Sequence, residues 1–194
     1  MLKQRGDTMV EVILAFAVFS MVSVGTMTVM GQGTNAAQRA LEITLVRQQI
    51  DAQAEALRAA QQAYSSSEIA SDSEWRKIAI ADAGQNSATY SSQTTCPSAL
   101  AQIPRSFIMD PRNASLVTSG SWFQDINART TRPYAQVETS GAVQAYGIWI
   151  EREFRPGNNV ADVYDFKVRA CWQGAGMNVP LQIETVVRLY EPGS

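Results

Sequence analysis

The stretch that decides the fold is residues 6–30, GDTMVEVILAFAVFSMVSVGTMTVM. Within it, the 19 residues from Val12 to Met30 include 14 apolar ones, and the others are Ser, Thr and one Gly. No charged residue follows Glu11 until Arg39. As a helix, 19 residues span about 28 Å, which is close to the hydrocarbon thickness of a bilayer. The stretch therefore predicts a membrane-inserted helix.

Charged residues at the start of this helix give its orientation and one functional candidate. Lys3 and Arg5 precede the helix, and few positive charges lie just beyond it. Because positive residues stay on the cytoplasmic side of a membrane, we expect the N-terminus in the cytoplasm and the bulk of the chain outside it. Glu11 lies at the edge of the apolar run, where an ionisable side chain is costly. A simple anchor has no use for it, so we interpret Glu11 as functional.

Gly6, a glutamate at the fifth position after it, and a long apolar helix together resemble the N-terminal signal of type IV prepilins and type II secretion pseudopilins. The resemblance is specific over residues 1–35 and is closest to minor pilins of the pilus-modification type. It implies that a prepilin peptidase cuts after Gly6, that Asp7 becomes the methylated N-terminus, and that Glu11 acts in assembly. It also implies a cytoplasmic-membrane assembly platform and other pilin subunits as partners. The mature chain would then form a filament at the cell surface.

Two departures from the family pattern stand out. The first mature residue is usually Phe, Met or Leu, whereas here it is Asp7, which is expected to satisfy part of the charge of the new amine. The proline that breaks the family's helix midway is missing. Gly25, Gly31 and Gly33 are expected to allow local melting instead, since each costs about 1 kcal/mol in a helix interior.

Other interpretations of the same segment remain open. A conventional secretory signal cut near residues 35–37 explains the basic start and the apolar core. A single-pass anchor of a binding module or adhesin that never polymerises explains the length. Neither explains Glu11. A pseudopilin of a type II secretion system is the alternative within the family, and whether the filament serves motility, adhesion, DNA uptake or secretion is not encoded in this segment.

Composition narrows the chemistry of the remaining chain. The formal charge is −2 and gives no overall attraction to nucleic acid or to an anionic membrane. The absence of histidine removes Ser-His-Asp and Cys-His catalysis, and we expect no enzyme, metal or cofactor. Gly31 to Ala36 mimics a dinucleotide fingerprint, but no strand is predicted before it. Cys96 and Cys171 are too few for a zinc site. They can form one disulfide outside the cytoplasm, or stay two unrelated thiols.

The predicted fold class is α+β, with a C-terminal antiparallel sheet packed on the second half of a long N-terminal helix. The parts are a leader (residues 1–6), an apolar assembly helix (7–35), its continuation (36–64) and a head (65–194). Helix formers and a stripe at Leu41, Leu45, Ile50, Ala54 and Leu57 predict one helix from about Thr8 to Ala63. A short helix is predicted at 74–81 with Ser73 as its cap. Alternating patterns predict four strands at 134–138, 146–154, 163–172 and 181–190.

Three surface features of the head are candidates for binding or modification. Trp149 and Trp172 are expected to face outward or to cover the sheet edge. Arg105, Arg112, Arg129 and Arg132 occupy a loop-rich region with only two acids, which is compatible with a DNA-contacting patch but more typical of a solvated face. Asn113-Ala114-Ser115 matches the acceptor pattern for N-glycosylation, and three-residue matches of this kind are common by chance.

Overall fold

The computed structural model describes residues 7–66, 73–80, 86–118, 121–126, 132–157 and 161–191. Helix α1 (Asp7–Ser66) is continuous over 60 residues, and the chain divides at Leu41 and Glu42 into two structural units that are described separately. The first unit contains the apolar part of α1. The second contains the rest of α1 and the whole head. The predicted α+β class is confirmed, and the long helix begins and ends within a few residues of its predicted limits.

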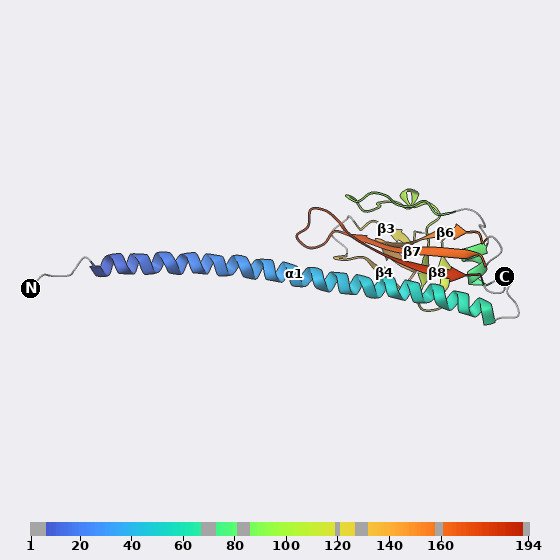
Figure 1. Cartoon of the computed structure of the whole chain (residues 1–194), viewed down its shortest axis with the longest axis horizontal. Helices are drawn as coiled ribbons and strands as arrows, with labels where there is room; N and C mark the ends of the chain where they lie inside the picture. The colour runs from blue at the N-terminus through green and yellow to red at the C-terminus, as the bar shows by residue number, and fades with distance from the viewer. Residues whose placement is uncertain are drawn as a thin grey trace, which may run out of the picture. The chain divides into compact units, whose positions relative to one another are not determined.

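The head contains three small sheets made of eight described strands. One sheet pairs β1 (Ile108–Asp110) with β2 (Ser115–Val117) in an antiparallel hairpin. The second has the order β3-β5-β4, in which β3 (Phe123–Gln124) runs parallel to its neighbour. The third is the antiparallel sheet β6-β7-β8, which Figure 1 shows alongside the C-terminal part of α1. The remaining strands are β4 (Gln136–Glu138), β5 (Gln144–Tyr146), β6 (Ile148–Arg155), β7 (Val163–Trp172) and β8 (Leu181–Tyr190).

A stripe of apolar side chains on α1 forms one side of the core. Its buried members recur three or four residues apart, which keeps them on one face of a helix; they are Val46, Ile50, Ala54, Leu57 and Ala60. Leu41 was predicted to belong to this stripe, and that prediction is wrong, because its side chain is 60% exposed. Five residues separate Leu41 from Val46, which rotates it about 140° away from the buried face.

The sheet β6-β7-β8 has one apolar and one charged face, because successive side chains of a strand point to opposite sides. The buried side chains of the apolar face are Ile148, Ile150, Tyr164, Phe166, Val168, Ala170, Trp172, Val187 and Leu189, all of which join the hydrophobic core. Trp172 therefore shares the face of Phe166 and is fully buried, so the prediction that it faces outward or covers an edge is wrong. Its spacing of six from Phe166 was the signal, since an even spacing keeps two strand residues on one face.

Glutamine side chains fasten the helix to the backbone of the head. Gln53 is 1% exposed; its Nε2 donates to the carbonyl oxygen of Met109 at 2.8 Å, and its Oε1 accepts from the Met109 N–H at 2.8 Å. Gln49 Oε1 accepts from the N–H of Val137, and Gln61 Nε2 donates to the carbonyl oxygen of Tyr190. These amides satisfy backbone groups of the strands where they meet the helix.

A buried arginine holds the short helix that follows α1. The π-helix η1 (Arg76–Ile80) begins after Ser73, whose hydroxyl accepts from the Arg76 N–H, so the predicted cap is confirmed. Arg152 of β6 is 6% exposed and donates to the carbonyl oxygen of Ile78 at 2.6 Å. Carbonyls at the end of a short helix lack partners in their own segment, and the guanidinium supplies one. Trp75, Ile78 and Ala79 are buried, as their spacing predicted.

The four predicted strands are present as β4, β6, β7 and β8, with β7 and β8 at the predicted residues and β4 shorter. The segment 146–154 is interrupted at Gly147, which separates β5 from β6. Gly147 has φ of +68°, and a Cβ there would collide with the carbonyl oxygen of Cys171. Only glycine fits this position, because it tolerates both a positive φ and the close approach of another backbone.

Replacing Gln53 tests this junction. Gln53→Met keeps the side chain's length but leaves the buried N–H and carbonyl of Met109 without partners, so we expect a loss of about 3 kcal/mol in the free energy of unfolding. All four tryptophans lie in the head and are buried, so their fluorescence reports its unfolding in urea for the detergent-solubilised chain. Gln49→Met, which removes one bond at a half-buried position, is the control and should cost less than about 1.5 kcal/mol. Equal losses for both variants would contradict this role of Gln53.

Candidate functional site

The first unit presents an apolar helix whose side chains are exposed on every side. Phe16 is 67% exposed and Met21 is 79% exposed, and the same holds for their neighbours from Met9 to Met30. By length and composition the segment can cross a membrane, and none of its apolar window is buried within the described chain. Helices of this composition near an N-terminus are either membrane spans or signal sequences. The structure therefore provides a large apolar surface that has to be covered by something outside this chain.

The hydroxyl groups within this segment are satisfied by the helix itself. Ser20 donates to the carbonyl oxygen of Phe16 at 2.7 Å, Ser23 to Phe19 at 2.8 Å, and Thr26 to Val22 at 2.8 Å. Thr28 bonds to Val24 in the same way. Each bond links a residue to the carbonyl one turn earlier, so no hydroxyl proton needs water. The polar residues of the stretch are therefore compatible with lipid or with packed helices.

Glu11 lies in α1 with an exposed side chain. Within the residues that the structure describes, its carboxylate forms no ion pair or hydrogen bond. Asp7 is the first residue of α1, and the predicted processing residue Gly6 lies outside the described residues. The structure thus places Glu11 on the open surface of the apolar helix and leaves the cleavage after Gly6 as a prediction.

The three glycines of the apolar segment do not interrupt the helix. Gly25, Gly31 and Gly33 all lie within the continuous α1, so the expected local melting is not seen. Apart from the adjacent residues and the nearby backbone of the helix itself, no atom lies within 4 Å of the position that a Cβ would take at any of them. A glycine at such an open site costs helix stability without improving the packing within this chain. The small residues leave room for another helix to approach closely.

The two cysteines are joined in the structure. A disulfide links Cys96 to Cys171 over a sequence separation of 75 residues, and both residues are buried. It fastens the segment that begins at Asn86 to the central strand β7. In the same region Tyr90 packs edge-on against Trp149, with ring centroids 5.9 Å apart. Trp149 is on the charged side of the sheet, but this segment covers it and it is only 2% exposed, so the prediction that it faces outward or covers an edge is wrong.

A buried carboxylate organises that covering segment. Glu151 is 2% exposed, and its Oε1 accepts from Trp149 Nε1 at 2.8 Å and from the Tyr90 N–H at 3.0 Å. Arg169 lies 3.3 Å away and also pairs with Glu184 at 2.6 Å. Burying a charge is tolerable only when it is paired and hydrogen-bonded. Its hydrogen bonds to Trp149 and Tyr90 and its ion pair with Arg169 offset the cost of burying it.

On the charged face of the sheet, ion pairs link the side chains of neighbouring strands. Asp165 of β7 accepts from Arg188 of β8 at 2.7 and 2.8 Å, and Arg155 Nε of β6 lies 3.1 Å from its Oδ2. The hydrogen bond with Arg188 holds the pKa of Asp165 below its ordinary value of 3.8. Lys167 pairs with Glu153 at 2.9 Å and lowers the pKa of that carboxyl as well. Opposite charges alternate across the strands and leave little net field.

The arginines that were considered for DNA contact have local partners. Arg112 forms an ion pair with Asp110 at 2.7 Å, and the side-chain hydrogen bond lowers the pKa of that carboxyl. Arg132 pairs with Glu138 and lies over the ring of Tyr146. Arg105 donates to the carbonyl oxygen of Asn86. Arg129 lies outside the described residues. These contacts order the loops of the head, and DNA binding remains a prediction without support from this arrangement.

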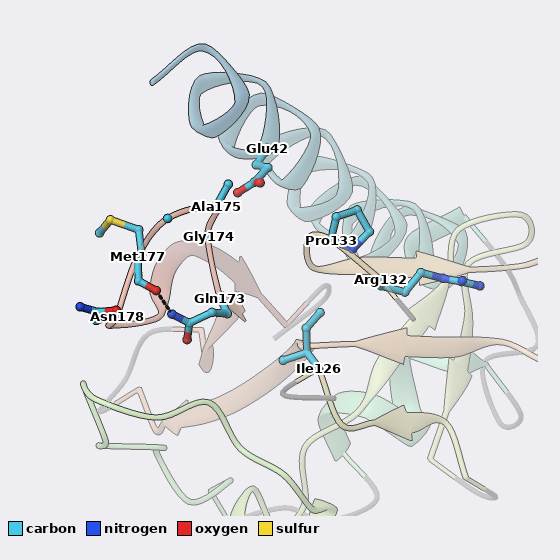
Figure 2. A pocket seen from close by; sticks show the side chains of 10 residues that line it. Glu42, Ile126, Arg132, Pro133, Gln173, Gly174, Ala175, Met177 and Asn178 are labelled. Carbon is cyan, nitrogen blue, oxygen red and sulfur yellow. Dashed lines mark hydrogen bonds between the residues drawn. The ribbon is translucent and has the colours of Figure 1, made fainter. Parts of the chain in front are cut away.

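A cavity of about 370 Å³ lies between the head's part of α1, the β7–β8 loop and the Arg132–Pro133 segment. Figure 2 shows Glu42 of α1 beside Gly174 and Ala175 of that loop. Glu42 Oε2 accepts from Trp172 Nε1 at 3.1 Å, and Gln173 Nε2 donates to the carbonyl oxygen of Met177. Two polar side chains of the cavity wall are therefore already hydrogen-bonded. Glu42 links α1 to the end of β7, and Gln173 closes the loop on itself. No group of three or more Cys, Asp or Glu that could hold a metal ion occurs among the described residues.

Neither the contacts of the glutamine side chains nor the burial of Arg152 was predicted from the sequence. The spacing of Gln49, Gln53 and Gln61 by multiples of four residues places them on one face of α1, beside the apolar stripe, and was the available signal. The buried Arg152 has no such signal, because a strand residue with a charge is expected on the polar face.

No protein-family model, no curated protein and no solved structure matches this chain. What the structure defines is an architecture: a long apolar N-terminal helix whose C-terminal part packs against an antiparallel sheet in a disulfide-bonded head. This architecture is pilin-like.

The ion pair at Asp165 predicts an acid-sensitive head. Its folded-state pKa is lower than in the unfolded chain, so Asp165 contributes stability above about pH 4 that is lost as the pH falls through the folded value. Asp165→Asn should lower the unfolding free energy at pH 7 and flatten its decline below pH 4, measured by urea titration at several pH values. Asp51→Asn, at an exposed position of α1, should leave the pH profile unchanged. An unaltered acid decline in Asp165→Asn would contradict the assignment.

Proposed function

We propose that this chain is a structural subunit, of the minor type, of a type IV pilus or a related filament. The observation that carries the proposal is the combination in α1 of an apolar surface exposed on all sides with a carboxylate, Glu11, that has no partner within the described chain. A membrane anchor accounts for the apolar surface alone. A helix that leaves the membrane and packs against its own kind accounts for both.

The apolar surface supplies the driving force for assembly outside the membrane. Each large side chain from Met9 to Met30 gains roughly 1.5–3 kcal/mol when it moves from water to an apolar contact. Stored subunits would keep this surface in the cytoplasmic membrane, and extraction by the assembly machinery would exchange lipid for neighbouring helices. The internally bonded hydroxyls of Ser20, Ser23 and Thr26 suit both environments.

Glu11 supplies the register between subunits. A carboxylate in a membrane helix is costly, by up to about 2.5–3.5 kcal/mol at the helix centre on insertion scales and by less toward its edge, where Glu11 lies. After removal of residues 1–6, the new amine at Asp7 carries a positive charge, and the amine of one subunit would pair with Glu11 of the next. A strong contact forms only when two subunits are aligned, so the pair selects one stagger of the helices.

The head then forms the outer surface of the filament. The disulfide between Cys96 and Cys171 supports an exported location, because such bonds persist in oxidising compartments. It joins a loop to the central strand β7 and does not close a short C-terminal loop, which favours a minor over a major subunit on the strength of the resemblance. A pseudopilin of a type II secretion system would use the same helix and the same pairing.

Replacing Glu11 tests the assembly role. In Glu11→Ala cells we expect the chain to remain in the membrane while its amount in sheared filaments falls more than tenfold, because loss of one partner of a desolvated ion pair costs about 3–5 kcal/mol. Immunoblots of the membrane and filament fractions measure both amounts. Glu55→Ala is the matched control, since Glu55 lies on the same helix but is exposed and paired with Arg58. Normal filament content in Glu11→Ala would refute the pairing mechanism and favour a non-polymerising adhesin.

Mass spectrometry of the mature N-terminus tests the processing step. We expect the purified chain to begin at Asp7 and to carry one methyl group on its amine, with residues 1–6 removed. Gly6→Leu should block the cut and leave the leader attached. A mature chain that still begins at Met1, or one that begins near Ala37 as a conventional secretory signal would leave it, contradicts the proposed processing.

A further inference from the structure

The hairpin that joins β1 to β2 contains the only Asn-X-Ser or Asn-X-Thr sequence in the chain. Asn113 lies in the turn, its side chain is exposed, and Ser115 is the first residue of β2. The intervening residue is Ala114, so the proline that blocks such sites is absent. An exposed turn in an exported domain is the setting in which this sequence is modified. The exposed turn meets the requirement of accessibility, and the contacts of Asn113 carry the argument beyond the three-residue match.

The geometry of the turn leaves the reactive nitrogen available. Asn113 Oδ1 accepts from the Ser115 hydroxyl at 2.8 Å and from the Ser115 N–H at 3.2 Å. Its Nδ2 donates no hydrogen bond within the part of the chain that the structure describes. The acceptor amide and the hydroxyl that the modification requires are thus already in contact, and the nitrogen that would form the new bond is unengaged.

The turn does not depend on that nitrogen for its shape. The Ala114 N–H donates to the carbonyl oxygen of Asp110 at 2.9 Å, and the Arg112 N–H donates to Asp110 Oδ1 at 3.0 Å. Ala114 has φ of +54°, a conformation that alanine adopts at some cost, so the tip of the hairpin is held by its neighbours. A substituent on Asn113 Nδ2 would therefore extend into solvent and break no described contact.

The disulfide places this hairpin in the right compartment. Cys96 and Cys171 are oxidised in the same head, and N-linked transfer takes place on the outer side of the membrane, where disulfides also form. Oxidation and accessibility are independent observations, and both concern the folded head.

We propose that Asn113 is an N-linked glycosylation site that receives a saccharide from a lipid-diphosphate-linked donor. In the transfer, Asn113 Nδ2 forms a bond to the anomeric carbon of the first sugar while the bond from that carbon to the diphosphate oxygen breaks. The lipid diphosphate leaves with the electron pair, and a base of the transferase takes one proton from Nδ2. The modification requires export of the head and does not depend on filament assembly. The result of its test is therefore independent of whether Glu11 acts in assembly.

The test is a peptide mass measurement on the full chain purified from membranes of its own cells. Cleavage before aspartate releases residues 110–124, a peptide in which Asn113 is the only asparagine. We expect this peptide to carry the added mass of a saccharide, and fragmentation to place it on Asn113. Ser115→Ala, which keeps the asparagine and removes the hydroxyl, should lose at least nine-tenths of the added mass, whereas Ser115→Thr should retain it.

Two further variants make the result unambiguous. Asn113→Gln should remove the saccharide completely, and Asn178→Gln, an equivalent change at an exposed asparagine without a following Ser or Thr, should leave it in place. Mobility on a non-reducing gel tests the Cys96–Cys171 bond, and tryptophan fluorescence in urea tests the fold of the head in every variant, so a loss of modification can be separated from misfolding. An unmodified 110–124 peptide in the wild-type chain, or a saccharide that persists in Ser115→Ala, overturns the proposal.

Discussion

The structure of the head depends on the packing of one face of α1 against the apolar face of β6-β7-β8. Val46, Ile50, Leu57 and their neighbours supply the helix side of this contact, and Phe166 and Val168 lie at the centre of the sheet side. The contact requires residues 42–66 to stay helical as far as the sheet extends. It also requires the strand backbones that meet the helix to find hydrogen-bond partners, which is the role of Gln49, Gln53 and Gln61. The long helix is therefore a structural member of the head as well as a membrane-compatible segment.

The same helix changes its chemistry near Leu41. From Met9 to Met30 its large side chains are apolar and exposed, and hydroxyls such as that of Ser20 bond to carbonyl oxygens of the helix itself. From Glu42 onward it is amphipathic, with one buried stripe and charged residues on the opposite side. A helix that were apolar throughout could not carry a water-facing head, and one that were amphipathic throughout could not enter a bilayer. The two halves therefore differ in the surroundings that suit them, although they share one uninterrupted backbone.

Much of this arrangement could be read from the sequence, and the failures have physical causes. The limits of the helix and of strands β7 and β8 were predicted within a few residues. Long segments in which apolar residues recur at a regular spacing indicate their secondary structure clearly. Leu41 was assigned to the stripe because it is apolar, although its rotation about the helix axis excludes it. The prediction for Trp172 overlooked its even spacing from Phe166 along β7. That spacing places both side chains on the same, buried face of the sheet. Strand β4 was predicted, but β3 and the pairing of β4 with β5 in a separate sheet were not, because two- and three-residue strands are too short to show alternation. Glu11 is on the open helix surface and has no partner among the described residues, so its role had to remain a proposal.

The disulfide has a mechanical meaning that follows from covalent topology alone. Residues 97–170 lie inside the loop closed by Cys96 and Cys171, and this loop contains β1 to β6 and most of β7. A pull applied at the two ends of the chain passes through the sulfur bridge and bypasses the enclosed residues. About 250 Å of contour length is thereby withheld from extension. Under load the molecule can lengthen only through residues outside this loop, so the enclosed residues cannot be drawn out even after α1 and β8 have lost their packing.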